Sequence, residues 1–359
     1  MNIGIFTVNQ LGDNIVFLPV VQALRARFPG SRIFLATTPT AASLYDGDVP
    51  PEQRVVMTLA EFNGAWRHPL RLARLISRVF SERLHGSIVS GDQGNVAHLL
   101  ALLAGGRVRV GIRRDYIKVS RALTHIVEVP PGRSPAVRNW ELARTAVRVL
   151  GGGELDPFPP APDLRHLLGG ALRKPKRIIV HPGANMEIRR WPADRFRELA
   201  VRLAADFEVI WIEQPALEEV RLPGGITRFP PASLQEFVHL LGTAALLVAN
   251  NSGPMNLAAA TGTPAVILSG PSNPIWDPIW HAEKFLILRD TSLPCLPCEG
   301  ERFTVTKCAN LENPMACMKA WTAETVYART LEWAARWAVD PGGQTPAADG
   351  GGLQPFAKG

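Results

Sequence analysis

A carboxylate near the start of the chain is the first residue placed for chemistry. The apolar stretch 2–8 ends in a polar turn, 9–14, that contains Gly12 and Asp13. If the stretch is a β-strand, this turn lies at the carboxyl edge of a sheet, where a carboxylate can act as a general base. The alternative is that Asp13 only caps the helix that follows. The turn lacks the GxGxxG pattern, so it does not indicate dinucleotide binding.

A second candidate site lies where the apolar run 244–249 is followed by small polar residues. Pro254 suits the first turn of a helix, and the apolar run 265–269 completes a β-α-β unit. Such a unit directs the free N–H groups of the helix N-terminus, beside Ser252 and Gly253, toward the carboxyl edge of a sheet. A phosphate or diphosphate binds well there. The alternative is an ordinary βαβ unit without a ligand.

The four cysteines of the chain form one cluster with the spacing C-x2-C-x9-C-x8-C. Four thiolates within 23 residues match a tetrahedral zinc or iron site. Such a site is structural, because four thiolate ligands leave no open position. The alternative is four reduced thiols that pack a loop. The predicted ligands are Cys295, Cys298, Cys308 and Cys317.

A basic segment, 107–118, contains four arginines and one lysine. Arginine binds phosphate and carboxylate groups through its planar fork, so the segment is a candidate cradle for an acidic substrate. Arg113 and Arg114 are the central pair. The alternative is that the segment is a solvated edge.

Composition narrows the classes of protein. The chain has 359 residues, enough for two domains, and 46% of them are apolar, so a large core can form. It has no run of 18 apolar residues and no signal-peptide pattern at its start, so we expect a cytoplasmic protein. The net charge of +7 fits an anionic ligand, a nucleic acid or an anionic membrane surface. The chain has no nucleic-acid-binding motif, so we expect no nucleic-acid partner.

Strand and helix patterns alternate through both halves of the chain, which predicts two α/β domains. The stretch 151–163 has three glycines and four prolines and is typical of a linker. After it the alternation begins again. We therefore expect a first domain, a linker, a second domain, a C-terminal helix and a disordered tail, at residues 1–155, 156–175, 176–320, 321–339 and 340–359.

Four separated segments together resemble glycosyltransferase family 9, the bacterial heptosyltransferases. They are QLGDNIVFLPVVQALRARFP, HPGANMEIRRWPADRFRELA, VANNSGPMNLAAATGTPAVILSGPSNP and CLPCEGERFTVTKCANLENPMACM, in the family's order. The resemblance covers nearly the whole chain except the last twenty residues. It implies a GT-B fold, in which two Rossmann-like domains with doubly wound parallel sheets face a cleft.

The resemblance also implies a reaction. The N-terminal domain would bind the acceptor and the C-terminal domain an ADP-sugar, with ADP-heptose as the default. Transfer would be inverting and would need no metal for catalysis, and the acceptor would be an anionic glycan or glycolipid such as the lipopolysaccharide inner core. Peripheral contact with the inner membrane fits such an acceptor. Asp13 would be the general base, and Gly12, Arg113 and Arg114 would bind the acceptor. The residues implied at the donor are Arg189, Arg190, Asn251, Ser252, Gly253, Pro254, Met255 and Asn256.

Three positions depart from the family pattern. Asn251 stands where the family has aspartate, Asn256 where it has histidine, and Glu213-Gln214 where a glycine-rich turn is usual. The two asparagines leave the donor open, so a related ADP-, UDP- or GDP-sugar is an alternative. They also leave open a non-catalytic nucleotide-sugar-binding protein. Transfer to a protein or small aglycone and nucleotide-sugar epimerisation are further alternatives, although we identify no second acid–base pair for an epimerase.

Overall fold

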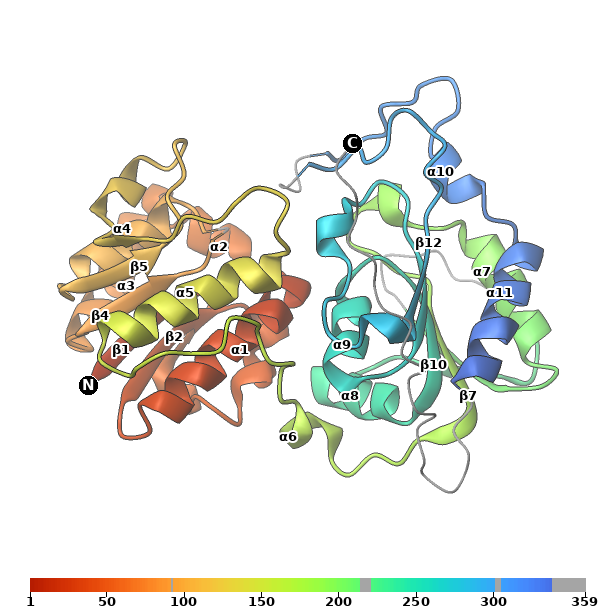
Figure 1. Cartoon of the computed structure of the whole chain (residues 1–359), viewed down its shortest axis with the longest axis horizontal. Helices are drawn as coiled ribbons and strands as arrows, with labels where there is room; N and C mark the ends of the chain where they lie inside the picture. The colour runs from red at the N-terminus through yellow and green to blue at the C-terminus, as the bar shows by residue number, and fades with distance from the viewer. Residues whose placement is uncertain (92, 214–220, 301–304, 338–359) are drawn as a thin grey trace.

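The computed structural model describes residues 1–91, 93–213, 221–300 and 305–337 and contains two six-stranded parallel sheets (Figure 1). The order of the first sheet is β3-β2-β1-β4-β5-β6, and that of the second is β12-β11-β10-β7-β8-β9. The strands of the first sheet are β1 (Asn2–Phe6), β2 (Arg32–Thr37), β3 (Arg54–Val56), β4 (Gly86–Val89), β5 (Val108–Gly111) and β6 (His125–Ile126). Those of the second are β7 (Lys174–His181), β8 (Glu208–Ile212), β9 (Ile226–Phe229), β10 (Ala244–Asn250), β11 (Ala265–Leu268) and β12 (Phe285–Leu288).

Both sheets are wound in the same way. Each begins with a central strand, β1 or β7, adds two strands on one side, and then crosses to the other side with β4 or β10. All the strand pairs are parallel, so every carboxyl end within a sheet lies at one edge. The predicted pair of doubly wound α/β sheets is therefore confirmed.

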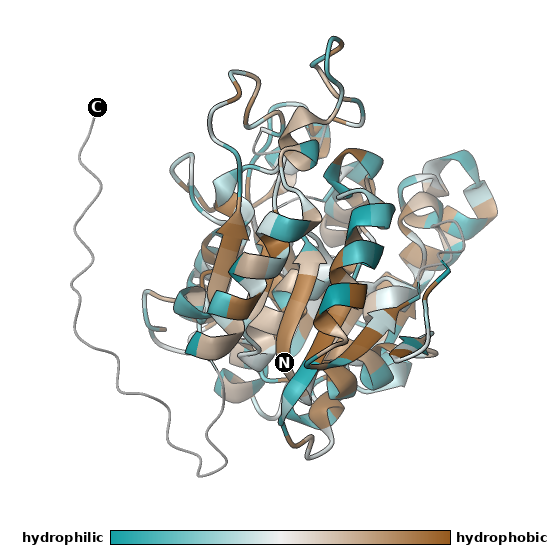
Figure 2. Cartoon of the chain, turned by 90° about the vertical axis from the view of Figure 1, so that its right-hand side faces the viewer, coloured by the Kyte–Doolittle hydropathy of each residue, from teal (hydrophilic) through white to brown (hydrophobic). Residues whose placement is uncertain are grey.

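Helices cover both faces of each sheet because alternate strand residues point to opposite sides. In β1, Ile3 and Ile5 pack with α1 (Leu11–Arg27) and α5 (Pro135–Val149), whereas Phe6 packs with α2 (Leu59–Asn63), α3 (Pro69–Ser81) and α4 (Asn95–Leu103). The second sheet lies between α8 (Leu234–Gly242) with α9 (Gly253–Thr261) and α7 (Ala193–Leu203) with α11 (Ala323–Arg336). Figure 2 shows apolar strands enclosed by helices with hydrophilic outer surfaces.

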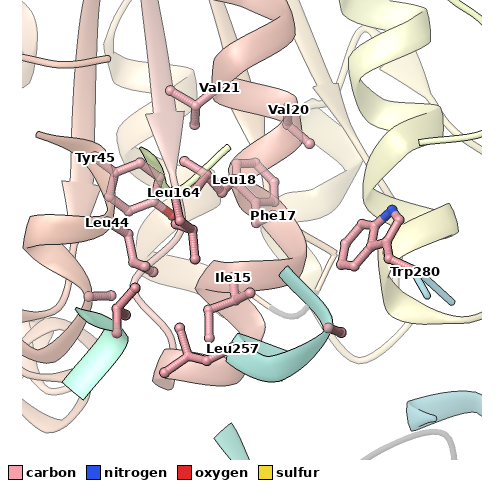
Figure 3. Packing of buried hydrophobic residues seen from close by; sticks show 14 of the residues in the cluster. Ile15, Phe17, Leu18, Val20, Val21, Leu44, Tyr45, Leu164, Leu257 and Trp280 are labelled. Carbon is pink, nitrogen blue, oxygen red and sulfur yellow. The ribbon is translucent and has the colours of Figure 1, made fainter. Parts of the chain in front are cut away.

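The two halves share one apolar core. Ile15 of α1 and Leu257 of α9 belong to the same buried cluster, together with Trp280 (Figure 3). The connecting chain is bonded to both halves: the Trp140 indole donates to the Asp156 carbonyl at 2.7 Å, and the Trp280 indole to the Pro159 carbonyl at 3.0 Å. The remaining α-helices of the described chain are short, α6 (Arg165–Leu168) and α10 (Ala316–Lys319), and several 3-10 helices lie in the loops.

Several boundaries follow from local chemistry. Ser233 caps α8 by accepting from the Glu236 N–H, and Gly262 ends α9 in the left-handed conformation at φ 65°. The prediction of a turn through residue 14 is wrong, because α1 already begins at Leu11. The reason is Asn14, whose side-chain amide donates to the carbonyls of Asn9 and Gln10 and fixes the chain at the helix start.

The C-terminal helix forms over Ala323–Arg336, whereas the predicted tail, 340–359, lies outside the described residues. Within the described ranges, no helix has both the length and the apolar character needed to cross a membrane.

Candidate active site

The topology places one candidate site in each sheet. In doubly wound sheets a ligand binds at the carboxyl edge, between the two central strands whose connections leave in opposite directions. In the first sheet these strands are β1 and β4, and α1 follows β1. In the second they are β7 and β10, and α9 follows β10. The Asp13 turn follows the first central strand of its sheet, and the Ser252–Gly253 turn follows the crossover strand of its sheet, so each lies at the carboxyl edge beside the central pair of strands.

Asp13 is half-buried in the first turn of α1, not before the helix. Gln10 is the N-cap residue, so the alternative that Asp13 caps this helix is wrong. The next residue, Asn14, is fully buried and stabilises the turn through its side-chain hydrogen bonds. Its Oδ1 accepts from the Tyr45 hydroxyl at 2.8 Å and also from the hydroxyls of Thr7 and Thr37. Asn14 is thus a positioning residue that the sequence analysis missed.

The Asp13 turn contacts the N-terminus of α9. A Cβ atom placed on Gly12 would lie 2.8 Å from Asn256 Nδ2 and 3.6 Å from Gly253 Cα, so only glycine fits here without a shift. The contact brings the N-termini of α1 and α9 together from opposite halves of the chain. The structure therefore brings the turn that contains Gly12 and Asp13 next to the residues around Gly253.

The N-terminus of α9 can receive an anion. Ser252 precedes the helix with extended backbone, but its side chain makes no capping bond and instead donates to the Asn250 carbonyl. The first N–H groups of the nine-residue helix are therefore not capped by Ser252, and the helix dipole favours negative charge at this end. Pro254 and Met255 are buried and form its first turn, as predicted.

Asn250 is a second positioning residue that the sequence analysis missed. It is fully buried, its Oδ1 accepts from the Trp191 N–H at 2.9 Å, and its Nδ2 donates to the Pro182 carbonyl at 2.8 Å. These bonds tie the end of β10 to the loop that follows β7. The same loop begins after His181, whose pKa burial lowers to about 4, so this imidazole is neutral near pH 7.

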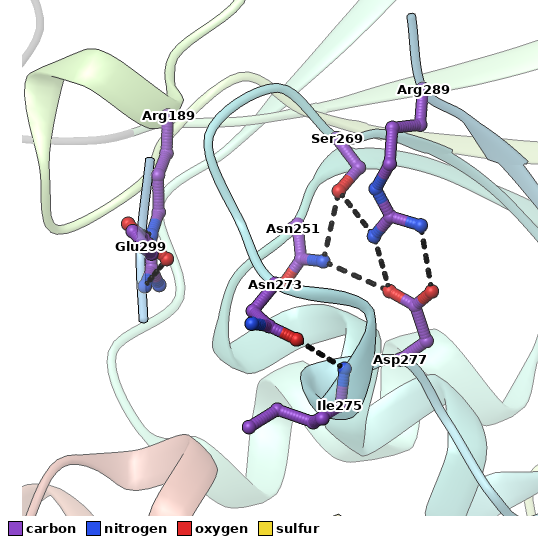
Figure 4. Close-up of polar contacts among 8 residues, drawn as sticks. All are labelled: Arg189, Asn251, Ser269, Asn273, Ile275, Asp277, Arg289 and Glu299. Carbon is purple, nitrogen blue, oxygen red and sulfur yellow. Dashed lines mark hydrogen bonds and ion pairs between the residues drawn. The ribbon is translucent and has the colours of Figure 1, made fainter. Parts of the chain in front are cut away.

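Asn251 belongs to a polar cluster at the ends of β10, β11 and β12 (Figure 4). Its Nδ2 lies 3.2 Å from Ser269 Oγ and 3.5 Å from Asp277 Oδ1. Arg289 donates to both carboxylate oxygens of Asp277, at 2.7 and 2.9 Å, and to Ser269 Oγ at 3.0 Å. The carboxylate of this cluster thus comes from Asp277, a residue that no sequence signal marked.

The two predicted donor arginines differ in their surroundings. Arg189 makes a bidentate pair with Glu299, with N–O distances of 2.6 and 2.5 Å, and the Glu299 side chain is fully buried (Figure 4). Its charge is therefore already balanced by a carboxylate. Arg190 donates through Nε to the Ala184 carbonyl at 2.8 Å, and no carboxylate of the described chain pairs with it.

The basic segment is divided between the two edges of the first sheet. Arg107 precedes β5, whereas Arg113 and Arg114 follow it and lie at the carboxyl edge with Asp13. Arg109 donates to the carbonyls of Ala122 and Gly106, so its side chain has a structural role. Arg113 is exposed, and Arg114 Nε donates to the Gly91 carbonyl at 3.3 Å, in the loop after β4.

The four cysteines do not form the predicted metal site in this structure. No group of three or more His, Cys, Asp or Glu side chains within the described ranges is arranged to hold a metal ion. Cys298 Sγ donates to the Cys295 carbonyl at 3.1 Å and Cys308 Sγ to the Asn310 carbonyl, so both face the backbone as thiols. Burial and then the neighbouring thiols, Cys298 first, raise the pKa of Cys317 to about 11.

Comparison with known proteins places this geometry in a family. The model of glycosyltransferase family 9 (heptosyltransferase) matches residues 75–308. Over 110 residues the chain is 31% identical to lipooligosaccharide heptosyltransferase 2 of Haemophilus influenzae, a match that covers 27% of this chain and about a third (32%) of that relative's length.

Solved structures agree in fold. The structure of E. coli heptosyltransferase WaaC with ADP-2-deoxy-2-fluoro heptose aligns with a TM-score of 0.69 and 16% identity, over 92% of this chain and 99% of WaaC. E. coli ADP-heptose lps heptosyltransferase II aligns with a TM-score of 0.67 and 18% identity, over 93% of this chain and 99% of that one. The iron-containing dodecameric glycosyltransferase TibC from enterotoxigenic E. coli aligns with a TM-score of 0.56 and 15% identity, over 93% of this chain and 76% of TibC. These likenesses confirm the GT-B fold. Since the family model spans more than half of the sequence, this chain belongs to glycosyltransferase family 9, the heptosyltransferase family.

Proposed function

We propose that this chain is an inverting transferase that moves a heptose from ADP-heptose to a hydroxyl group of a lipopolysaccharide core acceptor. The observation that carries the proposal is the contact between Gly12 and Asn256, which joins the Asp13 turn to the N-terminus of α9. This contact supports a reaction in which Asp13 acts as the general base and the start of α9 binds the diphosphate of the same donor. The names of the related structures, which include ADP and an ADP-heptose analogue, support the choice of donor.

The reaction follows from this arrangement. Asp13 accepts the proton of the acceptor hydroxyl as its oxygen bonds to the anomeric carbon. The bond from that carbon to the diphosphate oxygen breaks on the opposite face, so the configuration inverts. Negative charge grows on the leaving diphosphate, and the N–H groups at the start of α9 and the Arg190 guanidinium stabilise it. Arg189 contributes less, because Glu299 already neutralises it.

We assign the acceptor to residues 1–155 and the donor to residues 176–320, with 156–175 as the linker. Arg113 and Arg114 lie at the same sheet edge as Asp13 and suit the phosphate or carboxylate groups of an anionic acceptor. Changing both to Ala should raise the KM of such an acceptor and leave that of the donor unchanged. On the donor side, Asn251 and Asn256 contact the sugar or ribose hydroxyls as neutral amides.

The decisive test is Asp13→Asn, assayed by ADP release with ADP-heptose and a heptose-free core acceptor. Loss of the base should lower turnover by about 10²–10⁴-fold. Binding of ADP-heptose, measured as a thermal shift, should persist because Asp13 does not hold the donor. Asp206→Asn serves as the control, because Asp206 is exposed and lies just before β8, near the amino edge of the second sheet and not at the carboxyl edge. Turnover of the Asp13 variant within a few-fold of wild type would contradict the proposed base.

We further propose that the four cysteines hold one structural zinc or iron ion when metal is supplied. The support is their spacing and their mutual proximity: burial is the main cause that raises the pKa of Cys298, and the neighbouring thiols of Cys295 and Cys308 raise it further. A related structure is named as iron-containing. Elemental analysis of protein purified without a polyhistidine tag should find about one ion per chain. A metal-free protein with unchanged stability would exclude the ion.

A further inference from the structure

The outer side of α3 carries large apolar side chains that the rest of the described chain leaves uncovered. Leu70 and Phe80 are 77% and 66% exposed, and Trp66, in the short helix Ala65–Arg67 just before α3, is 62% exposed. The opposite side of α3 already serves the core through Leu75 and Val79. The exposed residues are therefore not needed for folding, and large exposed apolar side chains that gather on one surface mark a site of interaction.

Two free cations accompany these residues. Arg67 and Arg74 are exposed, and within the described ranges neither forms an ion pair. By contrast, Arg71 lies 3.7 Å from Glu61, and Arg78 pairs with the buried Glu82. Arg67 also lies over the Trp66 ring, at 4.9 Å from its centroid. We call Trp66, Arg67, Leu70, Arg74 and Phe80 the α3 outer face.

We propose that the α3 outer face docks the protein onto the surface of an anionic lipid bilayer. An amphipathic helix binds a bilayer lengthwise when its apolar side chains enter the acyl boundary and its arginines meet the lipid phosphates. Tryptophan suits the region between the headgroups and the acyl chains. The net charge of +7 favours the same surface. The positive charge of Arg67 and Arg74 complements anionic headgroups.

The α3 outer face begins at the same edge of the first sheet as the Asp13 turn. β3 is parallel to β2, and β2 to β1, so α2 and Trp66 follow β3 at the sheet edge that also carries the Asp13 turn. Asn63 of α2 lies beside the loop after β4, with its Oδ1 3.5 Å from a Cβ atom placed on Gly94. A lipid-borne acceptor would thus reach the site from the membrane. Only this last step rests on the proposed transfer reaction.

Flotation with lipid vesicles tests the docking without any transfer reaction. Wild-type protein should bind vesicles of phosphatidylglycerol and phosphatidylcholine, less so at high salt, and bind phosphatidylcholine vesicles weakly. Arg67→Gln/Arg74→Gln should lower the partition coefficient by about thirtyfold, and Trp66→Ser/Leu70→Ser by on the order of tenfold or more. The controls are Lys174→Gln/Lys176→Gln, which removes two exposed charges from the other half, and Leu172→Ser, which removes an 83% exposed leucine.

Three results would overturn the proposal. One is equal binding to both kinds of vesicle, and another is an equal loss of binding in the control variants. The third is a wild-type protein that does not bind vesicles, forms a dimer in sedimentation velocity, and becomes a monomer in Trp66→Ser/Leu70→Ser. In that case the α3 outer face would bind a second copy of the chain. Transfer to a water-soluble acceptor fragment should be normal in Trp66→Ser/Leu70→Ser. If wild-type protein binds vesicles but transfers no heptose to that fragment, the proposed transfer reaction is refuted and the membrane docking is not.

Discussion

Replacing Asn251 with aspartate would add a second carboxylate to the cluster at the ends of β10, β11 and β12. The cluster now holds one acid, Asp277, one base, Arg289, and the neutral amide of Asn251. The new carboxylate oxygen would replace Nδ2, 3.5 Å from Asp277 Oδ1. Two charges at that separation repel by about 5 kcal/mol at an effective dielectric constant of about 20.

Protonation of the new carboxyl group limits the loss of stability that this repulsion causes. A carboxyl group of ordinary pKa near 3.9 can be kept protonated at pH 7 for about 4 kcal/mol, and it then donates a hydrogen bond as the amide does. We therefore expect Asn251→Asp to lower the free energy of unfolding by about 2–4 kcal/mol at pH 7 to 8. The folded-state pKa of the new group would be raised, so the unfolded state releases its proton first. The destabilisation is then present at high pH and fades as the pH falls toward about 4.

Urea denaturation of wild type and three variants, from pH 5 to pH 8, measures this effect. Asn251→Ala removes the amide without adding charge and should cost about 1 kcal/mol at every pH. Asn251→Asp/Asp277→Asn returns the cluster to one acid and one base and should recover much of the lost stability. If Asn251→Asp is as stable as wild type at pH 8, or equally destabilised at both ends of the range, the electrostatic argument is wrong.

Two further predictions concern buried charge. Glu299→Met should lower the free energy of unfolding by about 3–5 kcal/mol because it removes the buried carboxylate that balances the charge of Arg189, whose side chain is only 12% exposed. Arg189→Met/Glu299→Met should cost much less, and similar losses in urea denaturation would contradict this. His181 has a folded-state pKa of about 4 against an ordinary 6.5, so its stabilising effect is complete above pH 6.5 and is lost as the pH falls toward 4. This effect amounts to at most about 3 kcal/mol, and the unfolding free energy of His181→Gln should depend less on pH over that range; equal slopes would exclude His181.

Local patterns predicted the fold well where neighbouring residues decide the structure. The unit from β10 to β11 was predictable because an apolar run, Pro254 and Gly262 each impose their own backbone preference. The start of α1 was mispredicted because polar residues 9–14 are typical of a turn. The buried Asn14 satisfies its amide on two backbone carbonyls, which holds those residues at the helix start.

The partners of the candidate site residues were not predictable, because they are distant in sequence. No residue close to Arg189 in the sequence indicates that its guanidinium pairs with Glu299. Likewise, no residue close to Asn251 in the sequence indicates that Asp277 lies beside it. The sequence showed that position 251 lacks the family's aspartate. Only the structure shows that Asp277 brings a carboxylate to the same cluster.

The connecting chain limits how far the two halves can separate. Going along it, the chain is bonded to α5 at Asp156, to the C-terminal half at Pro159, and to α1 at Asp163, where Gln22 both donates and accepts. The free length between the first two attachments is three residues, which span at most about 10 Å. We therefore expect any separation of the halves to be a rotation about the point where the Trp280 indole holds the connecting chain. Without that bond the stretch 156–163 would move with the N-terminal half, and the pivot would shift toward α6.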